Sequence, residues 1–316
     1  MAEQNDKDNK TRYDVVIIGG GPAGLTAGLY CSRARLKTLL VEKMLLGGQV
    51  MTTTEVENYP GFPGGIAGPE LMERMQEHCQ EFGLEVQTAQ VEKVENDGAV
   101  KKVVLDSGVI ESRSVIIASG AQPRKLGVPG EQELTGRGVS YCATCDGAFY
   151  RNMTVAINGG GDTAVEEALF LTRFASKVYL IHRRDQLRAV SVLQERLHAN
   201  DKIEVIWNSV IESCEGDNSG LTHLVLKDVN TGSTSKLEVQ GVFIAIGVEP
   251  KTGFLHGTVD LDDGGYIVTD MQCRTSVPGI FAAGDVRQGV LKQIATAVGA
   301  GATAAYEVER YLADLE

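Results

Sequence analysis

The sequence predicts an α/β protein built from two Rossmann-like domains, the second inserted into the first. Three observations support this prediction. A glycine-rich loop follows a short apolar run near the start of the chain, and the same pattern returns near the middle. A later segment, residues 277–312, contains the apolar run and the long Ala/Gly-rich helix needed to complete the first domain. The length of 316 residues is enough for two hydrophobic cores.

The composition argues against several classes of protein. The net charge is -12, so general nucleic-acid binding is not favoured. The sequence contains no run of about 18 apolar residues, which is the length needed to span a bilayer. The N-terminal "MAEQNDKDNKTR" is polar and lacks the apolar stretch of a signal peptide. We therefore expect a cytoplasmic protein with a frayed N-terminus and no membrane partner.

The first glycine loop lies in a complete βαβ pattern. The stretch "YDVVIIGGGPAGLTAGLYCSRARLKTLLVEK" predicts a strand over 14–18, a helix over 23–34 and a second strand over 38–42. Gly19, Gly21 and Gly24 match GxGxxG, which allows a tight turn, close approach of a pyrophosphate and close helix packing. Glu42 ends the second strand, where a carboxylate binds a ribose and repels a 2'-phosphate. A simple glycine turn is the alternative.

The second glycine loop has the opposite charge preference. A strand over 153–158 leads to Gly159 and Gly161, and Ala164 takes the last small-residue position before a helix and a strand over 177–181. No acid ends this strand. The residues that follow are His182, Arg183, Arg184 and Arg188. Guanidinium groups there can bind a 2'-phosphate, although a solvated basic turn, partly neutralised by Asp185, is the alternative. The two loops together indicate FAD and NADPH.

The order of these segments predicts the domain boundaries. The FAD domain comprises residues 1–124 and 252–316, and the NADPH domain comprises residues 125–251. The chain crosses between them near "ASGAQPRKLGVPG" and "IGVEPKTG", which contain the Pro and Gly typical of linkers. Asp285 ends the strand "GIFAAGD", where it can bind a ribityl hydroxyl or cap a helix.

Cys142 and Cys145 form the only closely spaced cysteine pair. A structural zinc site would need two further ligands at suitable spacing, and none is evident. A structural disulfide closing so short a loop would be unusual in the cytosol. A redox dithiol fits this spacing better, and Asp146 beside it can carry the proton exchanged at each step or cap the following turn. The single cysteines, Cys31, Cys79, Cys214 and Cys273, are predicted to be buried hydrophobic residues.

The segments "GGGPAG", "TTTEVENYPGFP", "CATCDG", "GGGDTAVEEAL", "HRR" and "FAAGDV" together resemble the low-molecular-weight, bacterial-type thioredoxin reductases, over nearly all of residues 12–312. The resemblance implies a homodimer with bound FAD, NADPH as donor and thioredoxin as acceptor. It also implies a flavin site that includes Gln49, Asn58, Asp285 and Gln293. The chain departs from the family pattern at "VEPKTGFL" and at Lys292, where Arg usually precedes Gln293.

The predicted enzyme is therefore an oxidoreductase and flavoprotein with a redox-active disulfide. Electrons pass from NADPH to FAD, to Cys142–Cys145 and to the disulfide of thioredoxin, with Cys145 as the sulfur nearest the flavin. No metal is expected. The alternatives are a reductase of the same fold that serves ferredoxin or a peroxiredoxin system, and a non-catalytic flavin-bound redox sensor.

Overall fold

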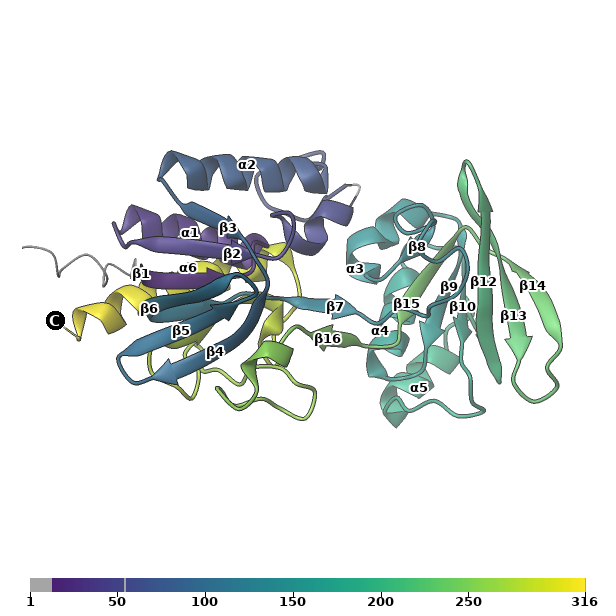
Figure 1. Ribbon diagram of the computed structural model, residues 1–316. Helices are drawn as coiled ribbons and strands as arrows, with labels where there is room; N and C mark the ends of the chain where they lie inside the picture. The colour runs from purple at the N-terminus through teal and green to yellow at the C-terminus, as the bar shows by residue number, and fades with distance from the viewer. Residues whose placement is uncertain (1–12, 54, 316) are drawn as a thin grey trace, which may run out of the picture. The chain divides into compact units, whose positions relative to one another are not determined.

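The computed structural model describes residues 13–53 and 55–315, which form two compact units (Figure 1). One unit comprises the described residues up to Gln122 together with those from Glu249 onward, and the other is Pro123–Val248. Both crossings lie in the Pro/Gly-bearing segments, where β7 (Ala121–Pro123) pairs with β16 (Val248–Pro250). The predicted frayed N-terminus lies outside the described residues. Among those residues, no helix is long and apolar enough to cross a membrane.

The first unit has a mixed sheet in the order β3-β2-β1-β6-β5-β4, with β17 also paired to β6. These strands are β1 (Tyr13–Ile18), β2 (Thr38–Glu42), β3 (Glu85–Thr88), β4 (Val91–Asp97), β5 (Val100–Leu105), β6 (Gly108–Ile117) and β17 (Ile280–Ala282). Val15 and Ile17 enter one hydrophobic cluster, whereas Val16 and Ile18 enter another. Because side chains alternate along a strand, β1 is buried on both faces, as is typical of a central parallel strand.

The described residues of this unit form the α-helices α1 (Pro22–Arg33), α2 (Gly68–Glu81) and α6 (Ile294–Ala313). Small residues allow α1 and α6 to approach closely. A Cβ added to Gly301 of α6 would lie 2.2 Å from the Ala23 carbonyl oxygen of α1. The Ala/Gly-rich final helix therefore packs closely on α1, and β17 with α6 confirms the predicted closing strand and helix.

The second unit contains a parallel sheet in the order β11-β10-β9-β15-β8. Its strands are β8 (Val139–Ser140), β9 (Thr154–Gly159), β10 (Lys177–Ile181), β11 (Ile203–Ile206) and β15 (Gly241–Ala245). The α-helices of this unit are α3 (Ala143–Asp146), α4 (Asp162–Leu171) and α5 (Ser191–His198). A separate antiparallel sheet consists of β12 (Ser209–Asp217), β13 (Gly220–Asp228) and β14 (Thr234–Glu238). Each glycine loop thus joins a central parallel strand to a helix, one in each unit.

Candidate functional site

The first glycine loop places three glycines for three different physical reasons. Gly19 has φ +107, and an added Cβ would lie 2.4 Å from the Ala118 carbonyl oxygen. A Cβ on Gly24 would lie 1.8 Å from the Gly19 carbonyl oxygen, so the helix can pack here only without a side chain. Gly21 is the N-cap of α1 and has no atom within 4 Å of an added Cβ. The space beside Gly21 is therefore open, and no side chain caps the N-terminus of α1. The first N–H groups of the helix can thus donate to an anion.

Glu42 lies beside this loop at the end of β2. One carboxylate oxygen accepts the Gly20 N–H at 2.7 Å, and the other accepts the Met44 N–H at 3.2 Å. Two backbone donors hold the carboxylate at the loop. The arrangement fits the ribose contact predicted from the sequence.

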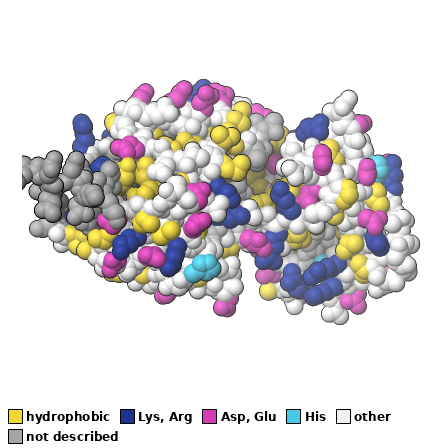
Figure 2. All heavy atoms as spheres, viewed as in Figure 1, with side chains coloured by type: hydrophobic (Ala, Val, Ile, Leu, Met, Phe, Trp, Pro, Cys, Tyr) yellow, Lys and Arg dark blue, Asp and Glu magenta, His cyan; other side chains and the backbone are white. Residues whose placement is uncertain are grey.

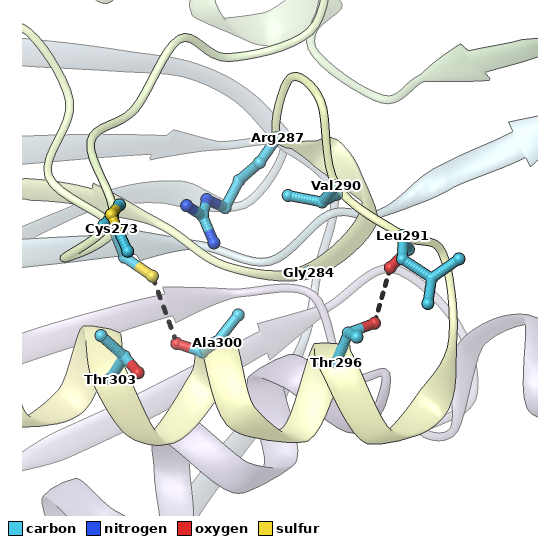
Figure 3. Close-up of a pocket in the computed structure, with 9 residues that line it drawn as sticks. Cys273, Gly284, Arg287, Val290, Leu291, Thr296, Ala300 and Thr303 are labelled. Atoms are coloured by element: carbon cyan, nitrogen blue, oxygen red, sulfur yellow. Dashed lines mark hydrogen bonds between the residues drawn. The ribbon is translucent and has the colours of Figure 1, made fainter.

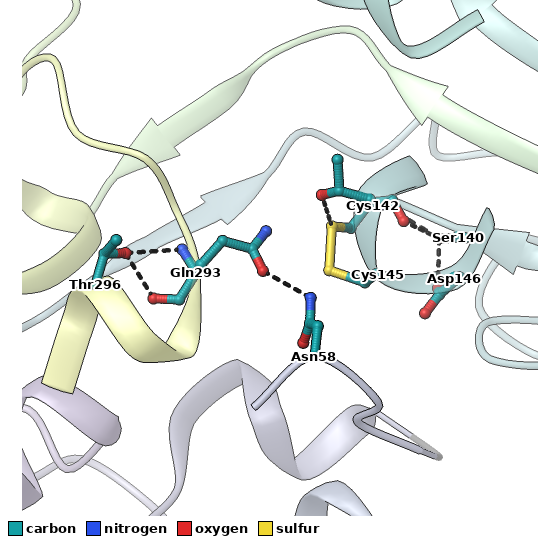
Figure 4. The surroundings of a disulfide bond; sticks show 8 residues. Asn58, Ser140, Cys142, Cys145, Asp146, Gln293 and Thr296 are labelled. Atoms are coloured by element: carbon teal, nitrogen blue, oxygen red, sulfur yellow. Dashed lines mark hydrogen bonds between the residues drawn. A yellow bond between two sulfur atoms is a disulfide. The ribbon is translucent and has the colours of Figure 1, made fainter. Parts of the chain in front are cut away.

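The remaining residues of the predicted flavin site also belong to the first unit. The Asn58 amide donates to Oε1 of Gln293 at 3.0 Å, which joins two residues far apart in the chain. Gln293 is the N-cap of α6 and forms a capping box with Thr296 (Figure 4). Gln49 donates from Nε2 to the Ala121 carbonyl oxygen. The structure therefore ties these amides to the backbone and to one another.

Asp285 lies in the short 3₁₀ helix η4 (Gly284–Val286). Burial raises the pKa of Asp285 to about 6, and the nearby Lys292 acts in the opposite direction. Its side chain caps neither η4 nor α6, whose N-cap positions are Ala283 and Gln293. A half-buried carboxyl without a capping role can accept hydrogen bonds from a polar ligand.

The second glycine loop repeats the geometry of the first. A Cβ on Gly159 would lie 2.5 Å from Cβ of Ala164 and 2.6 Å from the Ala245 carbonyl oxygen. Gly161 is the N-cap of α4, and an added Cβ there would have no neighbour within 4 Å. The N-terminus of α4 is thus open on the side of Gly161, as that of α1 is at Gly21.

The residues after β10 divide into two groups. Arg183, Arg184 and Arg188 are exposed, so their guanidinium groups can reach a ligand. Figure 2 shows Lys and Arg side chains gathered over the α5 end of this unit. His182, in contrast, is buried, and its ring nitrogens face backbone carbonyl oxygens.

Cys142 and Cys145 form a disulfide at the start of α3 (Figure 4). Ser140 connects this disulfide to the acid that follows it. Its hydroxyl donates to Oδ2 of Asp146 at 2.6 Å and accepts the Cys142 N–H at 3.1 Å. The Thr144 hydroxyl lies 3.3 Å from Sγ of Cys142. Burial raises the pKa of Asp146, although the bond from Ser140 lowers it. The carboxyl does not cap the following turn.

The family described as pyridine nucleotide-disulphide oxidoreductase matches residues 13–301. The chain belongs to this family. The thioredoxin reductase of Mycolicibacterium smegmatis is 50% identical over 307 residues, which cover 97% of this chain and 98% of the relative. The thioredoxin reductase of Streptococcus pyogenes MGAS5005 has a TM-score of 0.94 at 48% identity, covering 96% of this chain and 99% of that one. The thioredoxin reductase of Lactococcus lactis, in a structure titled FR conformation, has a TM-score of 0.66 at 47% identity, with the same coverages.

Within this family the chain is of the thioredoxin reductase type, a flavoprotein that uses a pyridine nucleotide to reduce a disulfide. The Cys142–Cys145 disulfide fits the redox-active centre of such an enzyme. The fold class and the enzyme class predicted from the sequence are therefore confirmed.

One acid at this reductase's disulfide was not predicted from the sequence. Glu167 on α4 accepts the Ala143 N–H at the start of α3. Burial raises the pKa of Glu167 to about 7, although this hydrogen bond lowers it. The helix pattern offered a signal, because Glu167 is three residues after Ala164 and four before Leu171, both of which are fully buried. An acid on the packed face of an amphipathic helix usually has a specific partner.

The four single cysteines take no part in this disulfide. As predicted, all four are buried, and all are free: Cys31, Cys79, Cys214 and Cys273. Burial raises the pKa of each thiol.

A cavity of about 310 Å³ lies beside the N-terminal half of α6, with Arg287, Thr296 and Thr303 in its lining (Figure 3). Across residues 13–53 and 55–315, no group of three His, Cys, Asp or Glu side chains could hold a metal ion.

Proposed function

We propose that this reductase passes electrons from NADPH, through bound FAD and the Cys142–Cys145 disulfide, to the disulfide of thioredoxin. The observation that supports this most directly is the disulfide itself, because Ser140 accepts the backbone N–H of Cys142 and donates to the half-buried acid Asp146. The second glycine loop and the exposed arginines belong to the same unit as the disulfide. The donor's binding residues and the redox pair therefore belong to one compact part of the chain.

FAD fits the first unit. The open N-terminus of α1 suits its pyrophosphate, Glu42 suits the adenosine ribose and Asp285 suits a ribityl hydroxyl. Asn58 and Gln293 supply further amide groups. When bound, the flavin accepts two electrons from the nicotinamide and passes them to the disulfide. The chain's own contribution is to bind the cofactor and to exclude water from it.

NADPH fits the second unit. Gly159 and Gly161 leave the pyrophosphate position open at the start of α4. Arg183, Arg184 and Arg188 supply exposed charge for a 2'-phosphate, and no carboxylate ends β10 to repel it. This is the feature that favours NADPH over NADH.

Asp146 handles the protons of thiol exchange. Reducing the Cys142–Cys145 disulfide requires two electrons and yields two thiols once two protons are bound. One thiolate then attacks the thioredoxin disulfide, and the bond between its two sulfurs breaks as a mixed disulfide forms. The second cysteine attacks that mixed disulfide, which restores Cys142–Cys145 and releases reduced thioredoxin. Asp146 can donate a proton to a leaving thiolate because its raised pKa keeps the carboxyl protonated at higher pH than usual. Cys145 is assigned as the sulfur nearest the flavin.

We also infer a homodimer in the cytoplasm. A reducing compartment is consistent with four free buried cysteines, since scattered thiols in oxidising compartments tend to be paired. Sedimentation of the FAD-loaded protein tests the dimer, and a monomer at micromolar concentration contradicts it.

The activity test is NADPH oxidation by purified protein with a small disulfide reagent, with and without thioredoxin. We expect yellow protein with about one FAD per chain, and turnover that thioredoxin accelerates. Turnover only with ferredoxin or a peroxiredoxin would assign the other partner. Flavin without any turnover would favour the redox sensor.

A further inference from the structure

His182 lies between the second glycine loop and the basic residues that follow β10. It directly follows β10, is 6% exposed and packs edge-on against Trp207. Its Nδ1 lies 2.9 Å from the Gly159 carbonyl oxygen in the glycine loop. Its Nε2 lies 3.0 Å from the Gln186 carbonyl oxygen in the basic turn, defined here as residues 183–190. One ring thus contacts both segments.

Further contacts join the same two segments. The Arg188 N–H donates to the Gly160 carbonyl oxygen at 2.7 Å, and the Val190 N–H donates to Oδ1 of Asp162 at 2.8 Å. A Cβ on Gly160 would lie 2.2 Å from Cε1 and Nδ1 of His182. Gly160 therefore lacks a side chain because the imidazole occupies that space. The glycine loop and the basic turn thus both pack against the imidazole ring of His182.

We propose that His182 is a positioning residue that holds the glycine loop and the basic turn at the spacing of two linked phosphates. The inference rests on the proposed binding of NADPH. A ligand with one phosphate at the glycine loop and another at the basic turn binds more tightly through the second phosphate only if these two subsites are already correctly spaced. A ligand with one phosphate does not depend on that spacing. The buried ring acts through the backbone carbonyls that it contacts, and the exposed arginines contact the phosphate.

The test compares ligands that bridge the two segments with ligands that do not. His182→Phe keeps an aromatic ring but removes both ring nitrogens, whereas His182→Gln keeps one donor group. Titration calorimetry of the FAD-loaded enzyme is done with 2',5'-ADP, which carries both phosphates, and with 2'-AMP, which carries one. We expect His182→Phe to weaken 2',5'-ADP about tenfold, the loss of roughly one hydrogen bond. Binding of 2'-AMP should change less than about twofold, and His182→Gln should recover part of the loss.

Steady-state kinetics give a second measurement. The KM for NADPH should rise in His182→Phe, while kcat at saturating NADPH and the KM for NADH stay near their wild-type values. His198→Phe, on the exposed face of α5, is the matched control and should change none of these quantities. Arg184→Ala is the comparison for direct contact and should weaken 2'-AMP and 2',5'-ADP alike.

Several outcomes would overturn the inference. Equal weakening of 2'-AMP and 2',5'-ADP by His182→Phe would make His182 a direct phosphate contact. An equal loss with NADH would show a general structural role. If His182→Phe does not fold, His182→Gln serves for the same comparison. A wild-type enzyme that binds 2',5'-ADP no better than 5'-AMP would refute the NADPH site itself, and the inference with it.

Discussion

At the scale of single residues, Asp146 has the properties of a proton carrier for the adjacent thiols. Burial raises the pKa of its carboxyl, so the group stays protonated at higher pH than an exposed aspartate. Asp146→Asn removes the ionisable carboxyl group but keeps the shape of the side chain. We expect reduced enzyme to react with thioredoxin about a hundredfold more slowly, while NADPH reduces the flavin at the normal rate. Rapid mixing measures the two steps separately.

The matched control for that experiment is Asp201→Asn, because Asp201 is an exposed acid of the same unit. This control should leave both steps unchanged. A thiol step at the wild-type rate in Asp146→Asn would remove the assigned role.

The two cysteines should each be required for protein disulfide reduction. A serine at either position cannot form the disulfide. We expect Cys142→Ser and Cys145→Ser each to abolish thioredoxin reduction, while the NADPH-dependent bleaching of the flavin persists. Thioredoxin reduction that survives in either single variant is incompatible with the proposed relay. Cys273→Ser, at a buried free cysteine, is the control and should retain thioredoxin reduction.

At the scale of elements, the helix that carries the disulfide is only four residues long and depends on its neighbour α4. Glu167 of α4 accepts the first N–H of α3, and burial raises its pKa to about 7. A folded-state pKa above the ordinary 4.5 means that the native state binds the proton more tightly. The stability from this group is therefore present at low pH and is lost as pH rises through 7, by about 3 kcal/mol at most.

Glu167→Gln keeps an oxygen for the Ala143 N–H but cannot ionise. We expect its melting temperature to fall less between pH 5 and pH 8 than that of the wild type, while Glu167→Ala destabilises α3 at both values. Fluorescence of Trp207, the only tryptophan, reports unfolding of this unit. Glu195→Gln, on the exposed face of α5, should retain the wild-type pH profile. The same slope in Glu167→Gln and the wild type would contradict this assignment.

The basic turn after β10 should determine the choice of donor. Removing one charge-assisted phosphate contact costs roughly 1.5–3 kcal/mol, about ten- to more than a hundredfold in efficiency. We expect Arg183→Ala and Arg184→Ala to lower kcat/KM for NADPH by such factors and to leave NADH nearly unaffected. Equal losses with both donors would mean that the arginines form only a solvated surface.

At the scale of the whole molecule, we expect the two units to move relative to each other during turnover. The disulfide and the second glycine loop belong to one unit, whereas Glu42 and Asp285 belong to the other. A flavin bound in the first unit must meet both the nicotinamide and the disulfide, and the dithiol must also reach a protein. Two thioredoxin reductases of nearly equal identity to this chain have TM-scores of 0.94 and 0.66, so such relatives differ from each other in overall arrangement.

We therefore expect the second unit to rotate about the β7 and β16 crossings. Such hinge motions take microseconds to milliseconds and can limit turnover. Protein with a covalent cross-link between the units should perform at most one half-reaction, and protein with a cross-link inside one unit should perform both. Rapid mixing of each species with NADPH and then with thioredoxin measures this. Normal electron transfer to thioredoxin by the locked species would exclude the rotation.

The sequence by itself determined the features that depend on neighbouring residues. A glycine loop, a Cys-x-x-Cys pair and a basic turn can each be recognised in a short continuous stretch of sequence. The close approach of the backbone to a pyrophosphate, the closure of a disulfide and the binding of a phosphate each depend on only a few neighbouring residues. The buried single cysteines and the small-residue face of α6 also followed from local pattern and composition. These observations were sufficient for the fold class and the type of reaction.

Only the tertiary structure decided which polar groups are partners and which are buried. The Asn58–Gln293 bond joins residues 235 positions apart, and the bond from Ala143 to Glu167 depends on how α3 packs on α4. His182 belongs to the same short basic segment as Arg183, yet the fold buries its ring and leaves the arginine exposed. α2 and the antiparallel strands β12–β14 were not predicted either. Burial and long-range hydrogen bonds depend on how distant segments pack, and no short stretch of sequence records that packing.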